Sequence, residues 1–269
     1  MPETNSFETG KFCWADLSTT DPDAAKKFYT SLFGWEIEDM PIPGGGTYSM
    51  AKVNGRYTGA LSAQMEEERA QGAPPHWNVY VSVDDVDTYA KRAEASGASI
   101  FMPPFDVLDS GRMAVLADPT GAIFCMWQPK EHSGYGLVNE PGAMDWNELL
   151  SPDPDRARSF YTELFDWKAE TMAMGAGPDA ADYTVFSLGE QAVAGLMKTP
   201  EGMPMPPHWT VYYNVADCDA SASKVTELGG QIYFGPHFME TVGKFATCAD
   251  PQGAVFAIIE PDQSAQQQQ

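Results

Sequence analysis

The chain has 269 residues and a formal net charge of −22, which comes from 38 acidic and 16 basic side chains. A surface of that sign repels phosphate groups, so the composition argues against a nucleic-acid partner. Hydrophobic residues make up 43% of the chain, which is enough for a buried core. No apolar run approaches the roughly 20 residues that span a bilayer, so we expect no membrane segment.

The first ten residues, MPETNSFETG, lack the basic stretch and the apolar core of a signal peptide. We therefore expect a cytoplasmic protein, although export without a leader would leave no trace in the sequence. The four cysteines form no CxxC pair, so neither a zinc site nor a disulfide framework is indicated. We expect reduced and mostly buried thiols.

The two halves of the sequence repeat each other at a constant offset of 132 residues. Twelve of 22 positions are identical between residues 14–35 and 146–167, and nine of 14 between residues 74–87 and 206–219. The third block, ADPTGAIF against ADPQGAVF, has six of eight positions identical. Three collinear matches indicate an internal duplication, whereas residues 36–73 diverge and suggest loop variation on a common scaffold.

Each half is expected to contain two modules, and each module consists of a strand, a helix and three further strands in that order. In the first half, Asp21 and Pro22 are typical of a helix start and Gly34 of a helix end. Asp84 or Asp85 is expected to cap the second helix, which ends near Ser96, and Asp118 opens a turn. The expected helices are residues 24–33 and 85–96, and the expected strands are residues 12–17, 35–39, 48–53, 58–64, 76–83, 99–101, 113–117 and 123–128.

The strand that leads into DPDxAxxFYxxLFxW, the tandem βαβββ order and the late DPxG hairpin resemble the glyoxalase/bleomycin resistance/dioxygenase (vicinal oxygen chelate) superfamily. Two linked domains that open with W-x-[DE]-L resemble its actinobacterial branch, which includes a culture-filtrate antigen and proteins called hydroxylases. The resemblance implies an α+β fold of two tandem domains, each with two βαβββ modules in a cupped, mostly antiparallel sheet. We expect the domains at residues 10–130 and 142–262, a linker at 131–141 and a disordered tail at 263–269.

The superfamily holds a divalent metal in each cup through His, Gln or Glu on the first, fifth and eighth strands. The resemblance places these positions at Trp14, Asn78 and Cys125 in the first half, and at Trp146, Thr210 and Ala257 in the second. Tryptophan and alanine supply no metal ligand. We therefore expect no metal at the family position and no cofactor.

A displaced metal site is the alternative. It would pair Asp16 with His76 in the first half, or Glu148 with His208 in the second. Each pair has two ligands, one short of the three usual in catalytic sites.

Alternation on a strand brings residues i and i+2 to one face. In each half this predicts an aromatic hollow with one carboxylate and one imidazole near its mouth, which suits a flat or apolar organic molecule. The expected lining residues are Trp14, Asp16, His76, Asn78, Tyr80, Cys125 and Trp127, and in the second half Trp146, Glu148, His208, Thr210 and Tyr212. The first half has the larger aromatic and polar complement, so we expect the better site there.

Each of these residues also has a structural explanation. The two tryptophans could be core residues that fill the space of a metal, and the two carboxylates could accept backbone donors. The histidines stand in a repeated PPHW, which suits the entry to a strand. The candidates for proton transfer are His76, Asp16, His208 and Glu148.

Two functions are consistent with this pattern. The first is a metal-free binder of a small organic molecule, expected to be a monomer or a weak dimer. The second is an enzyme, either a glyoxalase-type lyase acting on ketoaldehyde adducts or an oxygenase that uses a displaced metal or an organic cofactor.

Overall fold

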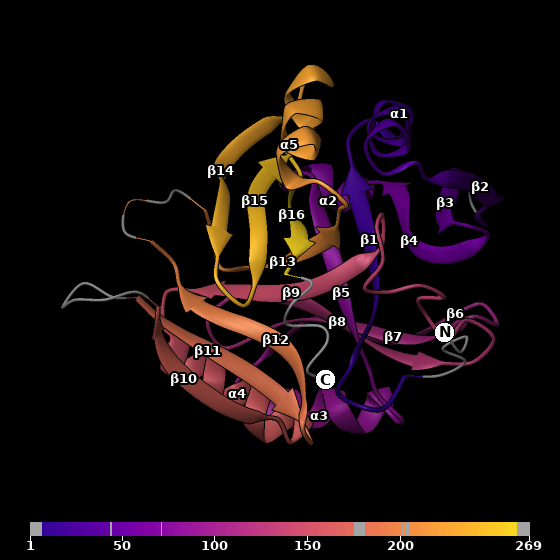
Figure 1. Cartoon of the computed structure of the whole chain (residues 1–269). Coiled ribbons are helices and arrows are strands. Elements are labelled where there is room, and N and C mark those ends of the chain that lie inside the picture. Colours follow the sequence, from indigo (N-terminus) through magenta and orange to yellow (C-terminus); the bar gives the residue numbers. More distant parts are fainter. Residues whose placement is uncertain are drawn as a thin grey trace.

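The computed structural model describes residues 7–262 except 44, 71, 175–180, 201, 203 and 204, so the expected tail at 263–269 lies outside the described residues. The chain forms two eight-stranded sheets, one in each half (Figure 1). The strands are β1 (Phe12–Thr19), β2 (Glu36–Pro41), β3 (Thr47–Val53), β4 (Arg56–Ala63), β5 (His76–Ser82), β6 (Ser99–Val107), β7 (Gly111–Ala117), β8 (Ile123–Pro129), β9 (Met144–Ser151), β10 (Lys168–Met174), β11 (Ala181–Leu188), β12 (Gln191–Lys198), β13 (His208–Asn214), β14 (Gln231–Met239), β15 (Gly243–Ala249) and β16 (Val255–Pro261).

The strand order is the same in both sheets. The first runs β2-β3-β4-β1-β5-β8-β7-β6, and the second runs β10-β11-β12-β9-β13-β16-β15-β14. In the first sheet β1 pairs parallel with β4 and antiparallel with β5, which joins the two modules of that half. The modules therefore pair within each half, and the predicted tandem fold of mostly antiparallel, cupped sheets is confirmed.

The two helices expected in the first half are present, each within two residues of its expected bounds. They are α1 (Pro22–Phe33), α2 (Glu66–Ala70), α3 (Val86–Ala95), α4 (Pro154–Phe165) and α5 (Cys218–Glu227). The Asp21 side chain accepts a hydrogen bond from the Ala24 amide, and Gly34 ends α1 at φ 71°. Asp85, rather than Asp84, caps α3. The short helix α2 was not predicted, because it lies in the segment where the two halves diverge.

The two halves share one continuous hydrophobic core. Phe28 of α1 contacts Phe256 of β16, and Phe160 of α4 contacts Phe124 of β8. Helix α1 lies beside α5, and α3 lies beside α4 at the opposite end of the molecule (Figure 1). The FYxxLF helices, α1 and α4, thus belong to the core and also join the two halves.

Matched hydrogen-bond chains cross between the halves. Trp77 Nε1 donates to the Tyr29 hydroxyl at 3.2 Å, and Tyr29 donates to Asp250 Oδ2 at 3.1 Å. The second half repeats this chain from Trp209 through Tyr161 to Asp118, at 2.9 and 3.1 Å. The aspartate of each DPxG turn thus binds a buried phenol of the other half, so the turn motif fixes the arrangement of the two domains.

No helix within the described ranges is long and apolar enough to cross a membrane. The four cysteines, Cys13, Cys125, Cys218 and Cys248, are free and buried, as expected.

Candidate functional site

The hollow of the first sheet, called here the first hollow, is built on β1, β5 and β8. Across the antiparallel β1–β5 pair, Trp14 lies opposite Tyr80 and Asp16 lies opposite Asn78. Across the parallel β5–β8 pair, Tyr80 lies beside Cys125 and Ser82 beside Trp127. Alternation therefore brings the expected residues of these three strands to one face.

Asp16 is the centre of the first hollow and is 6% exposed. Its oxygens accept hydrogen bonds from Asn78 Nδ2 at 2.9 Å, the Tyr80 hydroxyl at 2.8 Å and the Tyr48 hydroxyl at 2.9 Å. Trp14 Nε1 in turn donates to the Tyr48 hydroxyl at 2.8 Å. Burial raises the pKa of the Asp16 carboxyl, and the three donors partly offset that rise.

The second hollow repeats this arrangement on β9, β13 and β16. Glu148 lies opposite Thr210 and Trp146 opposite Tyr212, and Tyr212 pairs with Ala257. The Tyr212 hydroxyl donates to Glu148 Oε1 at 2.9 Å, and Trp146 Nε1 donates to the Tyr183 hydroxyl at 3.1 Å. Burial raises the pKa of Glu148, while hydrogen bonds from Tyr212 and Tyr183 lower it.

Tyr48 and Tyr183 hold the two carboxylates and were missed in the sequence. They are 135 positions apart rather than 132, because the halves diverge in length around them. Gly195, on β12, leaves room for Tyr183, since a β-carbon there would collide with the Tyr183 hydroxyl. The one feature of the sequence that could have pointed to them is their shared position near the start of a strand, Tyr48 in β3 and Tyr183 in β11.

The two PPHW histidines do not form hydrogen bonds with Asp16 or Glu148, the carboxylates of the two hollows. His76 Nδ1 lies 2.9 Å from the Pro74 carbonyl oxygen, and His208 Nδ1 lies 2.8 Å from that of Pro206. His76 Nε2 lies 3.9 Å from Glu68 Oε1 of α2. Among the described residues no group of three or more His, Cys, Asp or Glu side chains could hold a metal ion.

The linker covers the first hollow. The His132 ring lies edge-on to Trp14 with ring centroids 4.6 Å apart, and Trp127 Nε1 donates to the His132 carbonyl at 2.9 Å. Tyr135 also contacts Trp14, and its amide donates to the Cys13 carbonyl at 2.8 Å. Trp14 is left only 4% exposed. We expected the better site in the first half, but His132 and Tyr135, which lie outside the repeated blocks, cover its tryptophan.

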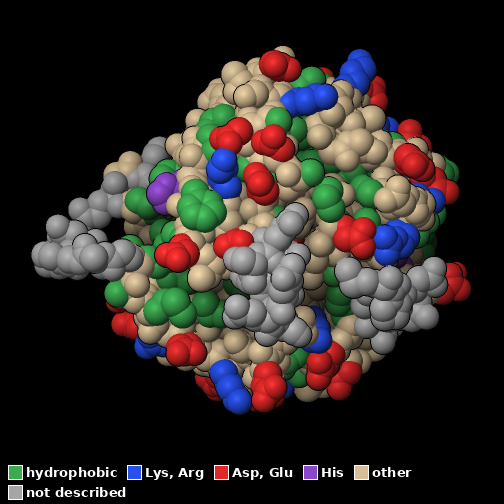
Figure 2. Space-filling model, viewed as in Figure 1, with side chains coloured by type: hydrophobic (Ala, Val, Ile, Leu, Met, Phe, Trp, Pro, Cys, Tyr) green, Lys and Arg blue, Asp and Glu red, His purple; other side chains and the backbone are tan. Residues whose placement is uncertain are grey.

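The second hollow keeps accessible aromatic surface. Trp146 is only partly buried and packs with Phe245 on the cluster of Tyr212, Ala257 and Ile259. Phe245 contacts Phe234 and His237 of β14, and Phe234 is 51% exposed. Figure 2 shows hydrophobic side chains between acidic ones over β14 and β15. Phe245 also contacts Tyr212, whose hydroxyl donates to the buried Glu148 carboxylate.

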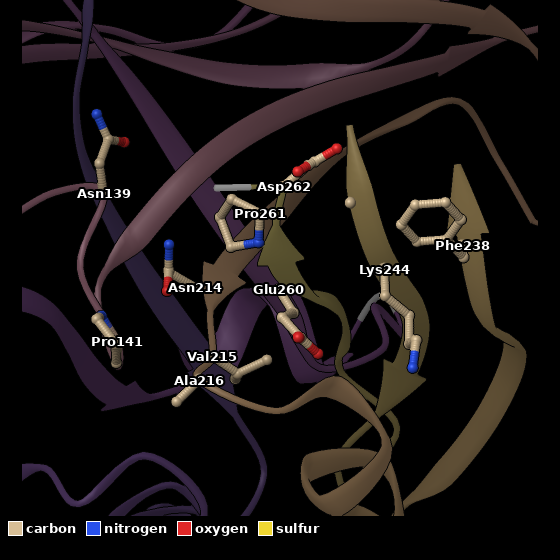
Figure 3. A pocket seen from close by; sticks show the side chains of 11 residues that line it. Asn139, Pro141, Asn214, Val215, Ala216, Phe238, Lys244, Glu260, Pro261 and Asp262 are labelled. Atoms are coloured by element: carbon tan, nitrogen blue, oxygen red, sulfur yellow. The ribbon is translucent and has the colours of Figure 1, made fainter. Parts of the chain in front are cut away.

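A separate groove of about 510 Å³ lies where the linker meets the second half. Figure 3 shows Asn214, at the end of β13, between the linker residues Asn139 and Pro141 on one side and Glu260 and Lys244 on the other. Lys244 forms an ion pair with Asp219, and Glu260 accepts a hydrogen bond from the Cys218 amide at 2.9 Å. None of the expected site residues lines this groove.

A family model described as "Glyoxalase/Bleomycin resistance protein/Dioxygenase superfamily" matches residues 11–126 and 143–258. The chain is 45% identical over 263 residues to CFP32 of Mycobacterium tuberculosis, which is provisionally named a glyoxylase, with 97% of this chain and 98% of the relative covered. It is 33% identical to the anthracycline biosynthesis protein DnrV of Streptomyces peucetius, with 94% of each covered.

Solved structures show the same fold at low identity. A Mn(II)-bound glyoxalase from Novosphingobium aromaticivorans has a TM-score of 0.63 at 18% identity, covering 94% of this chain and 82% of that one. The 2,3-dioxygenase LapB from Pseudomonas sp. KL28 has a TM-score of 0.64 at 13% identity, covering 94% of each.

Proposed function

Because the chain belongs to the glyoxalase/bleomycin resistance protein/dioxygenase superfamily, we propose that it binds a flat apolar or aromatic molecule in its second hollow without a metal ion. One contrast carries this proposal. His132 covers Trp14, whereas Trp146 remains partly accessible and shares the Tyr212 cluster with Phe245, which contacts the half-exposed Phe234. An aromatic wall with one polar group at its base is typical of sites for organic ligands.

The divalent metal of the superfamily does not fit the residues present. The Trp14 and Trp146 indoles donate to tyrosine hydroxyls, and an indole N–H has no lone pair for a metal. Asp16 already accepts three hydrogen bonds, and Ala257 has no ligating atom. Glyoxalase-type and dioxygenase-type chemistry therefore have less support than binding.

Three residue differences distinguish the face of the second hollow from that of the first. Ile259 stands where the first half has Trp127, Ala257 where it has Cys125, and Thr210 where it has Asn78. The first two changes remove a ring and a thiol, and the third replaces an amide with a smaller hydroxyl. Smaller side chains on this face favour a ligand larger than the single imidazole that rests against Trp14 in the first hollow.

The name of one relative agrees with such a ligand. DnrV is named for anthracycline biosynthesis, and anthracyclines are flat polycyclic aromatics. Stacking on one aromatic side chain adds about 0.5–1.5 kcal/mol beyond burial, and a hydrogen bond to a charged group adds about 1.5–3 kcal/mol. Apolar burial must supply the remainder, so we expect affinities in the micromolar range.

The test is a fluorescence titration of EDTA-treated, dialysed protein with a panel of two- and three-ring aromatic compounds. We expect at least one compound to bind. The Trp146→Ala variant should then bind it at least about tenfold more weakly, because the stacking wall is lost.

Trp14→Ala is the matched control, since it removes the equivalent indole from the covered hollow. It should change affinity by less than about twofold, provided that thermal melting shows both variants to be folded. Equal loss in both variants, or binding that returns only when a divalent metal is added, would refute the proposal.

A further inference from the structure

The second hollow contains a hydrogen-bond acceptor that has no partner. His208 lies opposite Leu150 on the β9–β13 pair, two residues before Thr210, which lies opposite Glu148. Alternation therefore places His208 on the same face as Thr210 and Tyr212. Its Nε2 atom is buried and makes no hydrogen bond.

The neighbouring proline fixes which nitrogen of His208 carries the proton. A carbonyl oxygen can only accept, so Nδ1, 2.8 Å from the Pro206 oxygen, must be the donor. Burial lowers the pKa of His208, which favours the neutral ring. In a neutral ring with a proton on Nδ1, Nε2 presents a lone pair and can only accept.

In the first half the equivalent nitrogen, His76 Nε2, lies 3.9 Å from the Glu68 carboxylate of α2, which is beyond hydrogen-bond distance. The first hollow has its own buried Nε2 without a partner, that of His132, but the His132 ring itself fills the space against Trp14. Of these two buried acceptors, only that of His208 lies in the hollow that keeps its aromatic surface accessible. A buried acceptor without a partner costs about 1–3 kcal/mol, and a ligand that donates to it removes that cost.

The strand register also gives the span of the ligand. Trp146 and Leu150 are four residues apart on β9, and His208 is opposite Leu150. Four residues of a strand cover about 13 Å. A molecule that stacks on Trp146 and reaches His208 must therefore be elongated, about the length of three fused rings.

Resting on the proposed binding in the second hollow, we propose that the ligand is an elongated polycyclic aromatic with a hydroxyl or N–H donor at one end, and that His208 Nε2 accepts this donor. Tryptophan stacking supplies affinity that is shared by all flat ligands. The acceptor at the far end supplies the selection among them, because it discriminates against compounds that lack a donor there.

The test uses three probes of one shape: 2-hydroxyanthraquinone, 2-methoxyanthraquinone and unsubstituted anthraquinone. Wild-type protein should bind the hydroxy compound about five- to twentyfold more tightly than either of the others, which corresponds to one hydrogen bond. The unsubstituted compound separates the loss of the donor from the added bulk of the methyl group. In the His208→Phe variant the hydroxy compound should bind about as tightly as the other two, whereas the His76→Phe variant should keep the wild-type preference.

The outcomes separate the two proposals. If all three probes bind wild type equally and Trp146→Ala weakens all three, the binding site stands and the role of His208 is wrong. If no probe binds, both proposals fail. Equal binding of the three probes to wild-type protein refutes the role of His208 even if His208→Phe does not fold.

Discussion

Replacement of Trp35 by alanine is expected to lower the free energy of unfolding by about 3–5 kcal/mol, the usual loss for a large aromatic in a core. Trp35 is 2% exposed and packs on Tyr29, Phe33 and Tyr213, the last from the second half. Its Nε1 also donates to the carbonyl of Gly142, the first residue of the second half, at 2.7 Å. The substitution therefore removes contacts to both halves and leaves the buried Gly142 carbonyl with only the longer hydrogen bond from Thr58 Oγ1, at 3.3 Å.

Urea denaturation followed by circular dichroism measures this effect. Trp167→Ala should produce a similar loss, because Trp167 has the equivalent place and donates to the Gly10 carbonyl at 2.9 Å. Phe101→Ala, at a side chain that is 60% exposed, should change stability by less than about 0.5 kcal/mol. Because one core spans both halves, we expect a single transition. Two transitions, of which only one shifts, would contradict the shared core.

Acidification from pH 7.5 to pH 4 is expected to remove up to about 3 kcal/mol of stability through His132. Burial lowers the pKa of His132 from 6.5 to about 4. The ring lies against Trp14, Tyr57 and Trp127, and its buried Nε2 has no partner. Between these two pKa values the unfolded chain binds a proton that the folded chain does not, so stability is full above about pH 6.5 and is lost as pH falls toward 4.

The measurement is the difference in unfolding free energy between wild type and His132→Phe at several pH values. The difference isolates His132 from other buried groups such as Asp16, Glu148 and His208, which titrate in both proteins. The unfolding free energy of the variant, relative to that of wild type, should rise as pH falls from 6.5 to 4. A difference that is constant with pH would mean that the ring is solvated and that the linker does not seal the first hollow.

The parts of the fold that depend on local patterns could be predicted from the sequence. Caps such as Asp21 and Gly34 and the alternation along β1 and β5 determine the elements and their faces, because these signals act over a few residues. The i, i+2 alternation of strand residues also predicted that Trp14, Asp16 and Tyr80 lie on one face, as they do in the structure. The path of the linker could not be predicted, because the contact of His132 with Trp14 depends on tertiary packing.

The polar partners were the least predictable part of the candidate site. The sequence suggested that each histidine stands with a carboxylate at the mouth of a hollow. In the structure a proline carbonyl two residues earlier binds the Nδ1 of His76 and of His208, while tyrosines bind the carboxylates. Hydrogen-bond partners of this kind depend on a register that composition and spacing do not determine.

The most direct test of metal-free binding in the second hollow is a crystal structure of EDTA-treated protein with a bound three-ring aromatic compound. The expected result is one molecule per chain, with its ring against Trp146 and Phe245 and no metal ion within reach of Glu148. A ligand in the groove beside Asn214 and Lys244, a ligand that displaces His132 from Trp14, or a metal bound by Glu148 would contradict it.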